Sequence, residues 1–162
     1  MSLARLVVPV AALVVLAGCS PSPSTAANVA GTVITESALS ETVDGCAELG
    51  VVQSRQTMLN VLVVGEVAKE AARLMGVQID QAAIDEAAAA DPQITALMAN
   101  PGCAKAVETN LVVSLLVPKV DQQKLMDQIA GIDVKLNPRY GQWDPATASV
   151  GGSGSVSVPA GS

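Results

Sequence analysis

Val29-Ala30-Gly31-Thr32-Val33-Ile34 is a short segment rich in β-branched residues, and it decides the fold expected for this chain. β-Branched residues favour extended backbone, so the segment predicts a strand. A second segment, Ile132-Asp133-Val134-Lys135-Leu136, alternates apolar and polar residues and predicts a half-buried strand. Since the sequence offers neither strand another partner, we expect the two to pair and to join the two ends of one domain.

Between these strands the sequence predicts helices, because Ala, Leu and Met are abundant and the start and stop signals are clear. The expected helices cover residues 35–50, 54–75, 80–90, 91–99 and 100–130. Pro118 lies inside the last one and should kink or split it, because proline removes a backbone hydrogen bond. The expected fold class is therefore mainly α, a helical bundle with a short two-stranded sheet that pairs the N- and C-terminal ends of the domain.

The N-terminus has the pattern of a secretory signal. A charged start with Arg5 is followed by an apolar run over residues 6–16 and by Leu16-Ala17-Gly18-Cys19. This run is too short to span a bilayer, which takes about 20 residues. The last four residues resemble the lipobox of bacterial lipoproteins, in which the cysteine sulfur carries acyl chains after cleavage. The resemblance implies lipid attachment at Cys19 and anchoring at the extracytoplasmic face of the cell membrane. The alternative is an ordinary signal peptide with a chance cysteine.

The cysteine count is consistent with a lipid on Cys19. The chain has three cysteines, an odd number that leaves one unpaired outside the cytoplasm. If Cys19 is lipidated, Cys46 and Cys103 remain as an even pair, and such a pair is expected to oxidise in that compartment. Helical spacing places both on apolar faces of separate helices, so we predict a Cys46–Cys103 disulfide.

The predicted domain organisation has four parts. Residues 1–18 are the signal peptide, and residues 19–27, which include Ser-Pro-Ser-Pro-Ser, are a flexible tether. The helical domain covers residues 28–145. Residues 146–162 are rich in Gly, Ser, Ala and Val and are expected to form a disordered tail.

Composition argues against several classes of function. Loss of Arg5 with the signal leaves 8 basic and 15 acidic residues, a net charge of −7, and nucleic-acid binding depends on basic clusters. The chain has no histidine, which is the commonest proton shuttle. The nearest carboxylate pairs, Glu66/Glu70 and Asp85-Glu86, lack a basic or nucleophilic partner in a recognisable arrangement. We therefore expect no catalytic residues, no cofactor and no metal site, and the protein is predicted not to be an enzyme.

Two segments resemble a known family. Val29-Ala30-Gly31-Thr32-Val33-Ile34-Thr35-Glu36-Ser37-Ala38-Leu39 is similar to the opening of SurA-like N-terminal domains, found in periplasmic and lipoprotein chaperones and in parvulin foldases. Val134-Lys135-Leu136-Asn137-Pro138-Arg139-Tyr140-Gly141-Gln142-Trp143-Asp144 resembles the closing strand and loop of actinobacterial lipoproteins with this domain. The resemblance implies a helical bundle whose terminal strands pair, and chaperone-like binding of unfolded or secreted polypeptides in an apolar cleft. The parvulin domain is missing, so isomerase activity is not implied.

Two features remain as candidate binding elements. Arg139, Tyr140 and Trp143 include both aromatic residues of the chain and would suit a peptide site, since such residues dominate binding energies. We favour the alternative that they seal the end of the bundle, with Arg139 paired to an acid. The run Leu111-Val112-Val113-Ser114-Leu115-Leu116-Val117 either lines a client groove or, as we favour, forms a buried central helix.

The alternative to a chaperone-like function is that of a structural or adaptor lipoprotein, which binds one specific cell-envelope partner.

Overall fold

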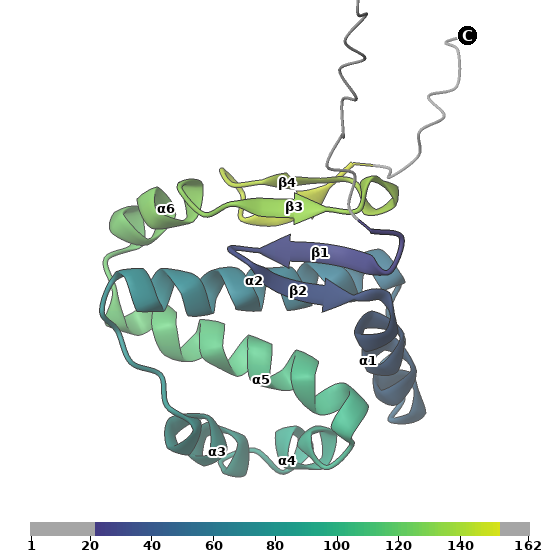
Figure 1. Cartoon of the computed structure of the whole chain (residues 1–162). Coiled ribbons are helices and arrows are strands. Elements are labelled where there is room, and N and C mark those ends of the chain that lie inside the picture. The colour runs from purple at the N-terminus through teal and green to yellow at the C-terminus, as the bar shows by residue number, and fades with distance from the viewer. Residues whose placement is uncertain (1–21, 153–162) are drawn as a thin grey trace, which may run out of the picture.

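The computed structural model describes residues 22–152, and within them the chain is mainly helical, as the sequence predicts. Two long helices, α2 (Arg55–Leu74) and α5 (Pro101–Leu116), lie side by side, and a small antiparallel sheet covers α2 on the side away from α5 (Figure 1). The other helices are α1 (Glu36–Glu48), α3 (Gln81–Ala89), α4 (Pro92–Met98) and α6 (Gln122–Ala130), and η1 (Val117–Lys119) and η2 (Pro138–Tyr140) are short 3-10 helices. The strands are β1 (Thr25–Val29), β2 (Thr32–Thr35), β3 (Val134–Leu136), β4 (Gln142–Asp144) and β5 (Ser149–Gly151).

The helices begin where the sequence predicts, because polar side chains cap them. Thr35 Oγ1 accepts a 3.1 Å hydrogen bond from the Ala38 N–H at the start of α1. Such caps satisfy backbone donors that the first turn of a helix leaves unpaired. Side chains at the starts of α2, α3, α4 and α5 act in the same way, namely Ser54, Asp80, Asp91 and Asn100.

The strand expected over residues 29–34 is wrong in detail, because this segment contains a turn between two strands. β1 and β2 form a hairpin whose loop residues, Ala30 and Gly31, both have positive φ, 48° and 95°. Two-residue hairpin loops require this geometry, which glycine adopts without steric cost. β1 also pairs with β3, so the sheet has the order β2-β1-β3. The predicted pairing of the two ends of the domain is therefore confirmed, but the sheet has three strands.

The ordered domain extends beyond both predicted boundaries. Residues 25–27, expected in the tether, belong to β1, where Ala26 and Ala27 are fully buried. Residues 149–151, expected in the tail, form β5 and pair with β4 in a second hairpin. Composition alone misleads here, because small residues also suit a strand that packs closely. The rest of the predicted tail, residues 153–162, and the predicted signal peptide lie outside the described residues.

The long helix expected over residues 100–130 is split at Pro118, one of the two outcomes predicted. α5 ends at Leu116, η1 contains the proline, and α6 begins after a new cap at Asp121. The Asp121 side chain accepts a 3.0 Å hydrogen bond from the Lys124 N–H. As a result α6 turns back over the C-terminal half of α2 and leads into β3 (Figure 1).

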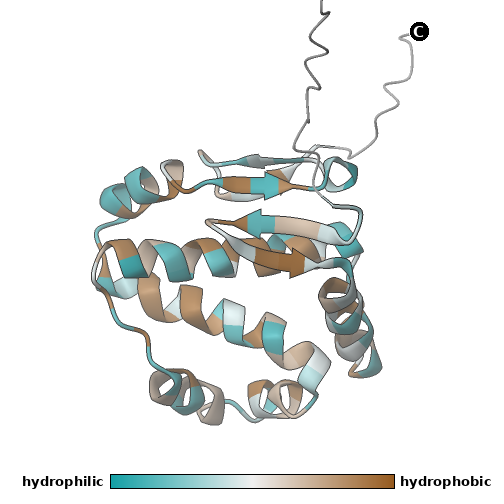
Figure 2. Ribbon diagram, viewed as in Figure 1, coloured by the Kyte–Doolittle hydropathy of each residue, from teal (hydrophilic) through white to brown (hydrophobic). Residues whose placement is uncertain are grey.

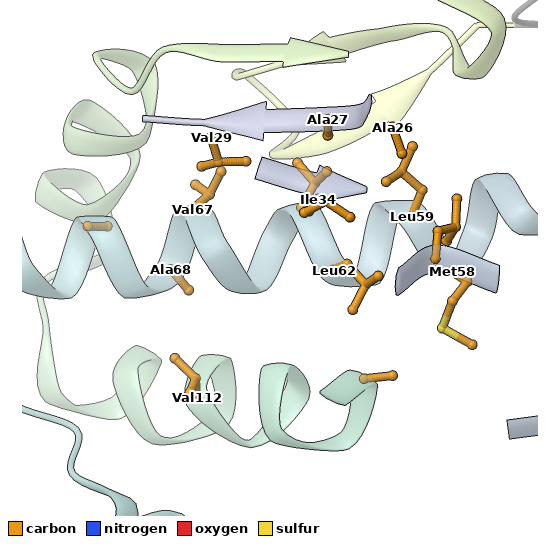
Figure 3. Packing of buried hydrophobic residues seen from close by; sticks show 14 of the residues in the cluster. Ala26, Ala27, Val29, Ile34, Met58, Leu59, Leu62, Val67, Ala68 and Val112 are labelled. Carbon is orange, nitrogen blue, oxygen red and sulfur yellow. The ribbon is translucent and has the colours of Figure 1, made fainter. Parts of the chain in front are cut away.

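The core lies between the sheet, α2 and α5. The strongest hydrophobic colouring falls on these elements, whereas α6 is mostly hydrophilic (Figure 2). Side chains from β1 and β2 point toward α2, and Val112 of α5 approaches α2 from the opposite side (Figure 3). Val29 lies above Val67, and Leu59, Val63 and Val67 are among the most buried large side chains. A buried aliphatic side chain of this kind contributes about 1.5–3 kcal/mol.

α5 approaches α1 and α2 closely because glycine lies at each crossing. The predicted disulfide is present and links Cys46 of α1 to Cys103 of α5, with a Cα–Cα distance of 4.5 Å. Beside it, a Cβ on Gly45 would lie 2.8 Å from the Cα of Gly102. At the second crossing, a Cβ on Gly65 of α2 would overlap the Thr109 side chain of α5. The disulfide therefore joins two helices whose backbones are already in contact.

Candidate functional site

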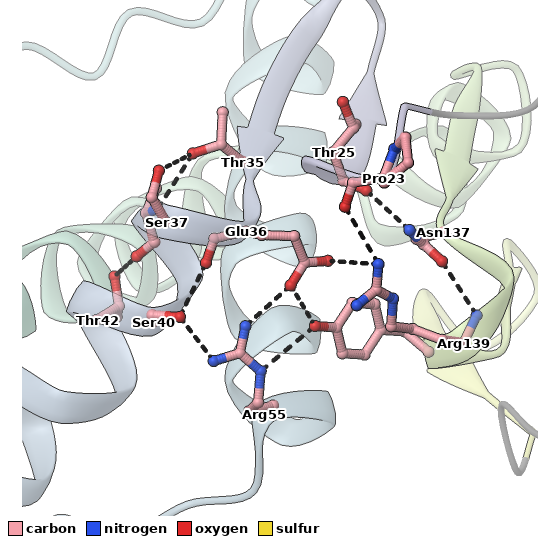
Figure 4. A network of polar contacts seen from close by, with 12 residues as sticks. Pro23, Thr25, Thr35, Glu36, Ser37, Ser40, Thr42, Arg55, Asn137 and Arg139 are labelled. Carbon is pink, nitrogen blue, oxygen red and sulfur yellow. Dashed lines mark hydrogen bonds and ion pairs between the residues drawn. The ribbon is translucent and has the colours of Figure 1, made fainter.

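Glu36 is the centre of a polar network that joins the two ends of the domain (Figure 4). Its Oε2 accepts hydrogen bonds from the Tyr140 hydroxyl (2.7 Å) and from Arg55 Nη2 (2.9 Å). Arg55 Nη1 also donates to Ser40 Oγ at 2.8 Å. Because Glu36 opens α1 and Tyr140 ends η2, the network connects residues 104 positions apart in the sequence.

Tyr140 is only 6% exposed, so its hydroxyl is enclosed by this network. Burial raises the pKa of Tyr140, and the negative charge of Glu36 acts in the same direction. The hydrogen bond from Arg55 opposes both effects, and the pKa remains above its ordinary value. Tyr140 therefore stays protonated at neutral pH and donates its hydroxyl hydrogen to Glu36.

Arg139 lies at the outside of the same network. Its guanidinium is 5.7 Å from the centre of the Tyr140 ring and 3.8 Å from Glu36 Oε1. Its Nη2 also donates a 3.2 Å hydrogen bond to the backbone oxygen of Pro23. Asn137 adds a second connection, because its Nδ2 donates to the backbone oxygen of Thr25 at 3.2 Å. Arg139 and Tyr140 thus contact residues of their own domain, as in the sealing arrangement that the sequence favours.

Trp143 lies apart from the network and lines a groove. The groove has a volume of about 1060 Å³ and separates β3 from the β4–β5 hairpin. Polar and apolar surface contribute almost equally to its lining, and the apolar part comes from Ile132, Val134, Leu136, Pro145 and Trp143. The indole Nε1 of Trp143 is buried and has no hydrogen-bond acceptor among residues 22–152. Of the three candidate peptide-binding residues, Trp143 is the one that lines this groove.

The hairpin that forms one wall of the groove is fixed by side chains of α2. Asn60 Oδ1 accepts a 2.7 Å hydrogen bond from the Val150 N–H of β5. Gln56 Nε2 donates to two backbone oxygens, those of Tyr140 (3.0 Å) and Gly152 (2.8 Å). These contacts connect the hairpin to a helix about 90 residues earlier, so no local sequence pattern indicates the groove.

The apolar run over residues 111–117 does not line this groove. Val112 and Leu116 are buried in the core, whereas Val117 is half exposed. The run therefore has one buried face and one partly exposed face, rather than being buried on every side. The face that contains Val112 and Leu116 belongs to the core, as expected of the central helix that we favour.

Three of the four carboxylates singled out in the sequence, Glu66, Glu70 and Asp85, are engaged in ion pairs or hydrogen bonds. Glu66 Oε1 lies 3.4 Å from Lys69 Nζ and 3.3 Å from Lys105 Nζ, and Lys69 also contacts Glu108. Burial alone would lower the pKa of Lys69, but these carboxylates outweigh it and raise the pKa. Two other carboxylates pair on their own helices, Glu70 with Arg73 and Asp85 with Gln81. This arrangement supports packing of α2 against α5 rather than acid–base chemistry.

Two further properties concern metal and membrane binding. Within residues 22–152, no group of three His, Cys, Asp or Glu side chains is placed to hold a metal ion. In the same part of the chain, every helix is too short or too polar to cross a lipid bilayer. The predicted lipid-attachment residue, Cys19, lies outside the described residues, three positions before Ser22.

Comparison of the chain with protein-family models, with curated proteins and with solved structures gave no significant match. Assignment of a function therefore rests on the groove and on the positions of Pro23 and Gly152, near the two limits of the described residues.

Proposed function

We propose that the protein is a lipid-anchored, extracytoplasmic lipoprotein of the SurA-like type that binds unfolded or secreted polypeptides and has no isomerase activity. The observation that carries this proposal is the groove beside β3 and the β4–β5 hairpin, in which Trp143 and several aliphatic side chains form the apolar part of the lining. Apolar grooves with an aromatic wall suit polypeptide segments, because burial of apolar side chains drives such binding. The proposal includes no catalytic step, cofactor, metal or nucleic acid.

The position of Pro23, close to the start of the described residues, supports anchoring through Cys19. Pro23 and Gly152 are both held near η2, through Arg139 and Gln56 respectively. The three Cα–Cα steps from Cys19 to Ser22 span at most about 10 Å in a fully extended chain. A lipid on Cys19 would therefore keep this end of the domain close to the bilayer. The groove, whose lining includes Pro138 and Gly152, would lie at the membrane-proximal end.

The second candidate is an adaptor lipoprotein that binds one specific cell-envelope partner. The observation that favours it is the small size of the site, because β3 and β4 have only three residues each. Such a site contacts one short segment at a time. A chaperone tolerates many such segments, whereas an adaptor selects one.

An aggregation assay tests the leading proposal. A chemically unfolded client is diluted into buffer with the purified protein at several-fold excess, and light scattering is followed. We expect slower aggregation for two clients of unrelated sequence. No effect at that excess contradicts chaperone-like binding, and an effect on a single envelope protein favours the adaptor.

A further inference from the structure

We infer that helices α3 and α4, residues 81–98, form a lid over α5, and that this lid opens as one unit while the core around α2 and α5 stays folded. The two helices pack on α5 and on each other, and they lie on the side of α5 opposite α2 (Figure 1). The inference concerns a different part of the molecule from the groove beside β3, and it holds whether or not that groove binds polypeptides.

The face of α5 beneath the lid carries apolar side chains. Thr109 marks the face that meets α2, because its side chain lies against Gly65. Val107 and Leu111 come two residues before and two residues after Thr109, which places both about 160° away from it around the helix. Val107 is nevertheless buried and Leu111 partly buried. Since the lid lies on that side of α5, its opening exposes apolar surface of α5 to solvent.

Few buried side chains attach the lid to the rest of the protein. Ile84 and Ala88 are the buried residues of α3, and α4 has none. Within residues 22–152, no hydrogen bond or ion pair joins α3 or α4 to α1, α2 or α5. The lid is therefore held closed by apolar contacts alone. Segments with few buried apolar contacts are those that open locally in native proteins.

Hydrogen bonds inside the lid hold its two helices together. The Thr95 hydroxyl of α4 donates a 2.9 Å hydrogen bond to the backbone oxygen of Ala88 in α3. The Asp91 N–H donates to the same oxygen at 3.3 Å, and the Asp91 side chain caps α4. Because these contacts are independent of α5, we expect the two helices to move together rather than to fray one by one.

The two connections of the lid allow it to move without α5. Gly76, between α2 and α3, has a φ of 68°, and a Cβ there would meet nothing within 4 Å. Such a position absorbs backbone rotation without a clash, as hinge residues do. At the other connection, Asn100 donates a hydrogen bond to Glu48 of α1 at 3.1 Å, and Cys103 is bonded to α1 by the disulfide. The start of α5 therefore stays in place when the lid opens.

The first turn of the lid is not sealed against the core. A cavity of about 580 Å³ lies there, and its lining includes Ile79 and Ile84 together with Ala72 of α2 and Val112 of α5. Side chains that line a cavity lack packing partners on one side, which weakens the attraction that keeps the lid closed.

Hydrogen exchange of the purified protein at low urea concentrations tests the inference. The amides of α3 and α4 should exchange at least 100-fold faster than the slowest amides of α2 and α5. Their rates should also depend little on urea, because opening of the lid exposes much less surface than unfolding of the whole molecule. Lid amides with the same rate and the same urea dependence as those of α2 would overturn the inference.

A matched pair of isoleucine variants provides the second measurement. Ile84 and Ile129 are both buried, with 4% and 7% of their surface exposed, but Ile129 belongs to α6, outside the lid. Ile84→Ala should accelerate exchange of the lid amides at least ten-fold, because truncation of a buried isoleucine leaves a cavity. Ile129→Ala should accelerate the α2 amides by a similar factor. It should leave the lid amides within two-fold, because the contacts of Ile129 persist while the lid is open.

The Ile129→Ala variant gives the decisive outcome. Equal acceleration of the lid amides and the α2 amides would show that the lid opens only when the whole molecule unfolds, and it would reject the inference. If either variant does not fold, the urea dependence of exchange in the unaltered protein decides. Neither measurement uses a client polypeptide, so failure of the lid leaves the proposed function untouched, and failure of the aggregation assay leaves the lid untouched.

Discussion

The hydroxyl of Tyr140 donates a 2.7 Å hydrogen bond to Glu36 Oε2 and so links the end of η2 to the start of α1. Contacts beside it hold the first and last described residues near the same end of the domain, because Arg139 binds the Pro23 oxygen and Gln56 binds the Gly152 oxygen. Tyr140 lies between β3 and β4 in the sequence, so its contact with Glu36 helps to fix the positions of the two strands that flank the groove.

The first prediction concerns this contact. Tyr140→Phe removes the hydroxyl while keeping the buried ring, and we expect the free energy of unfolding to fall by about 1–2 kcal/mol, measured by urea denaturation. Arg139→Gln is the control, because Arg139 is half exposed and 3.8 Å from the same carboxylate, and it should cost less than about 1 kcal/mol. A larger loss for Arg139→Gln than for Tyr140→Phe would contradict this account of the network.

The second prediction is an alkaline limit to stability. Because the pKa of Tyr140 is raised in the folded protein, its protonated form stabilises the fold fully below the ordinary tyrosine pKa of about 10. That contribution is lost as the pH rises through the folded pKa. Tyr140 is the only tyrosine of the chain, so ultraviolet absorbance follows its ionisation directly. We expect a midpoint above 10, and the stability difference between the unaltered protein and Tyr140→Phe should shrink over the same range. An ordinary midpoint contradicts the prediction.

The third prediction concerns the Cys46–Cys103 disulfide, which closes a separation of 57 residues. Replacement of both cysteines by Ala should lower the free energy of unfolding by about 4 kcal/mol, since the unfolded chain regains conformational freedom. Reduction of the unaltered protein should have a similar effect in guanidinium unfolding. Thiol labelling of the unreduced, unfolded protein should detect neither cysteine, and a labelled Cys46 or Cys103 would refute the bridge.

The fourth prediction tests the crossing of α2 and α5. Gly65→Ala places a methyl group against the Thr109 side chain and should cost about 1–3 kcal/mol, measured by thermal unfolding. Thr109→Ala removes the opposing atoms, so the double variant should recover part of that loss. Gly151→Ala is the control, because a Cβ there meets nothing within 4 Å. Strict additivity of Gly65→Ala and Thr109→Ala would show that the two sites do not touch.

The fifth prediction tests the anchor. Cys19→Ala should move the protein from the membrane fraction to the soluble fraction, because no lipid can be attached at that position. The double replacement of Cys46 and Cys103 by Ala is the matched control and should remain with membranes. Retention of Cys19→Ala in the membrane fraction would exclude anchoring through this cysteine.

The helices were predictable because their signals are local. Caps such as Thr35 and Asn100 lie within a few residues of the backbone N–H groups that they satisfy. A short stretch of sequence therefore contains both the cap and the start of the helix that it stabilises. The disulfide was predictable for a different reason. Once Cys19 is set aside, only Cys46 and Cys103 remain, and two cysteines outside the cytoplasm are expected to pair. These features determine the bundle and most of its helix boundaries.

The groove was not predictable, because distant contacts create it. Residues 149–151 form a strand only where Asn60 and Gln56 of α2 receive the hairpin, and a composition rich in Gly and Ser gives no sign of this. The turn at Ala30 was also hidden, since alanine rarely adopts positive φ and the β-branched residues around it favour a continuous strand. Trp143 was singled out together with Tyr140, but the separation of the two side chains in the fold depends on the turn between them.

The pairing of β1 with β3 has a consequence for the order of events during folding. A chain that is synthesised from its N-terminus presents β1 long before β3, so this pair of strands cannot form until more than 100 further residues have followed. Until then Ala26 and Ala27, which are buried in the finished domain, lack the cover that β3 provides. Completion of the β2-β1-β3 sheet is therefore a late step in the folding of this domain.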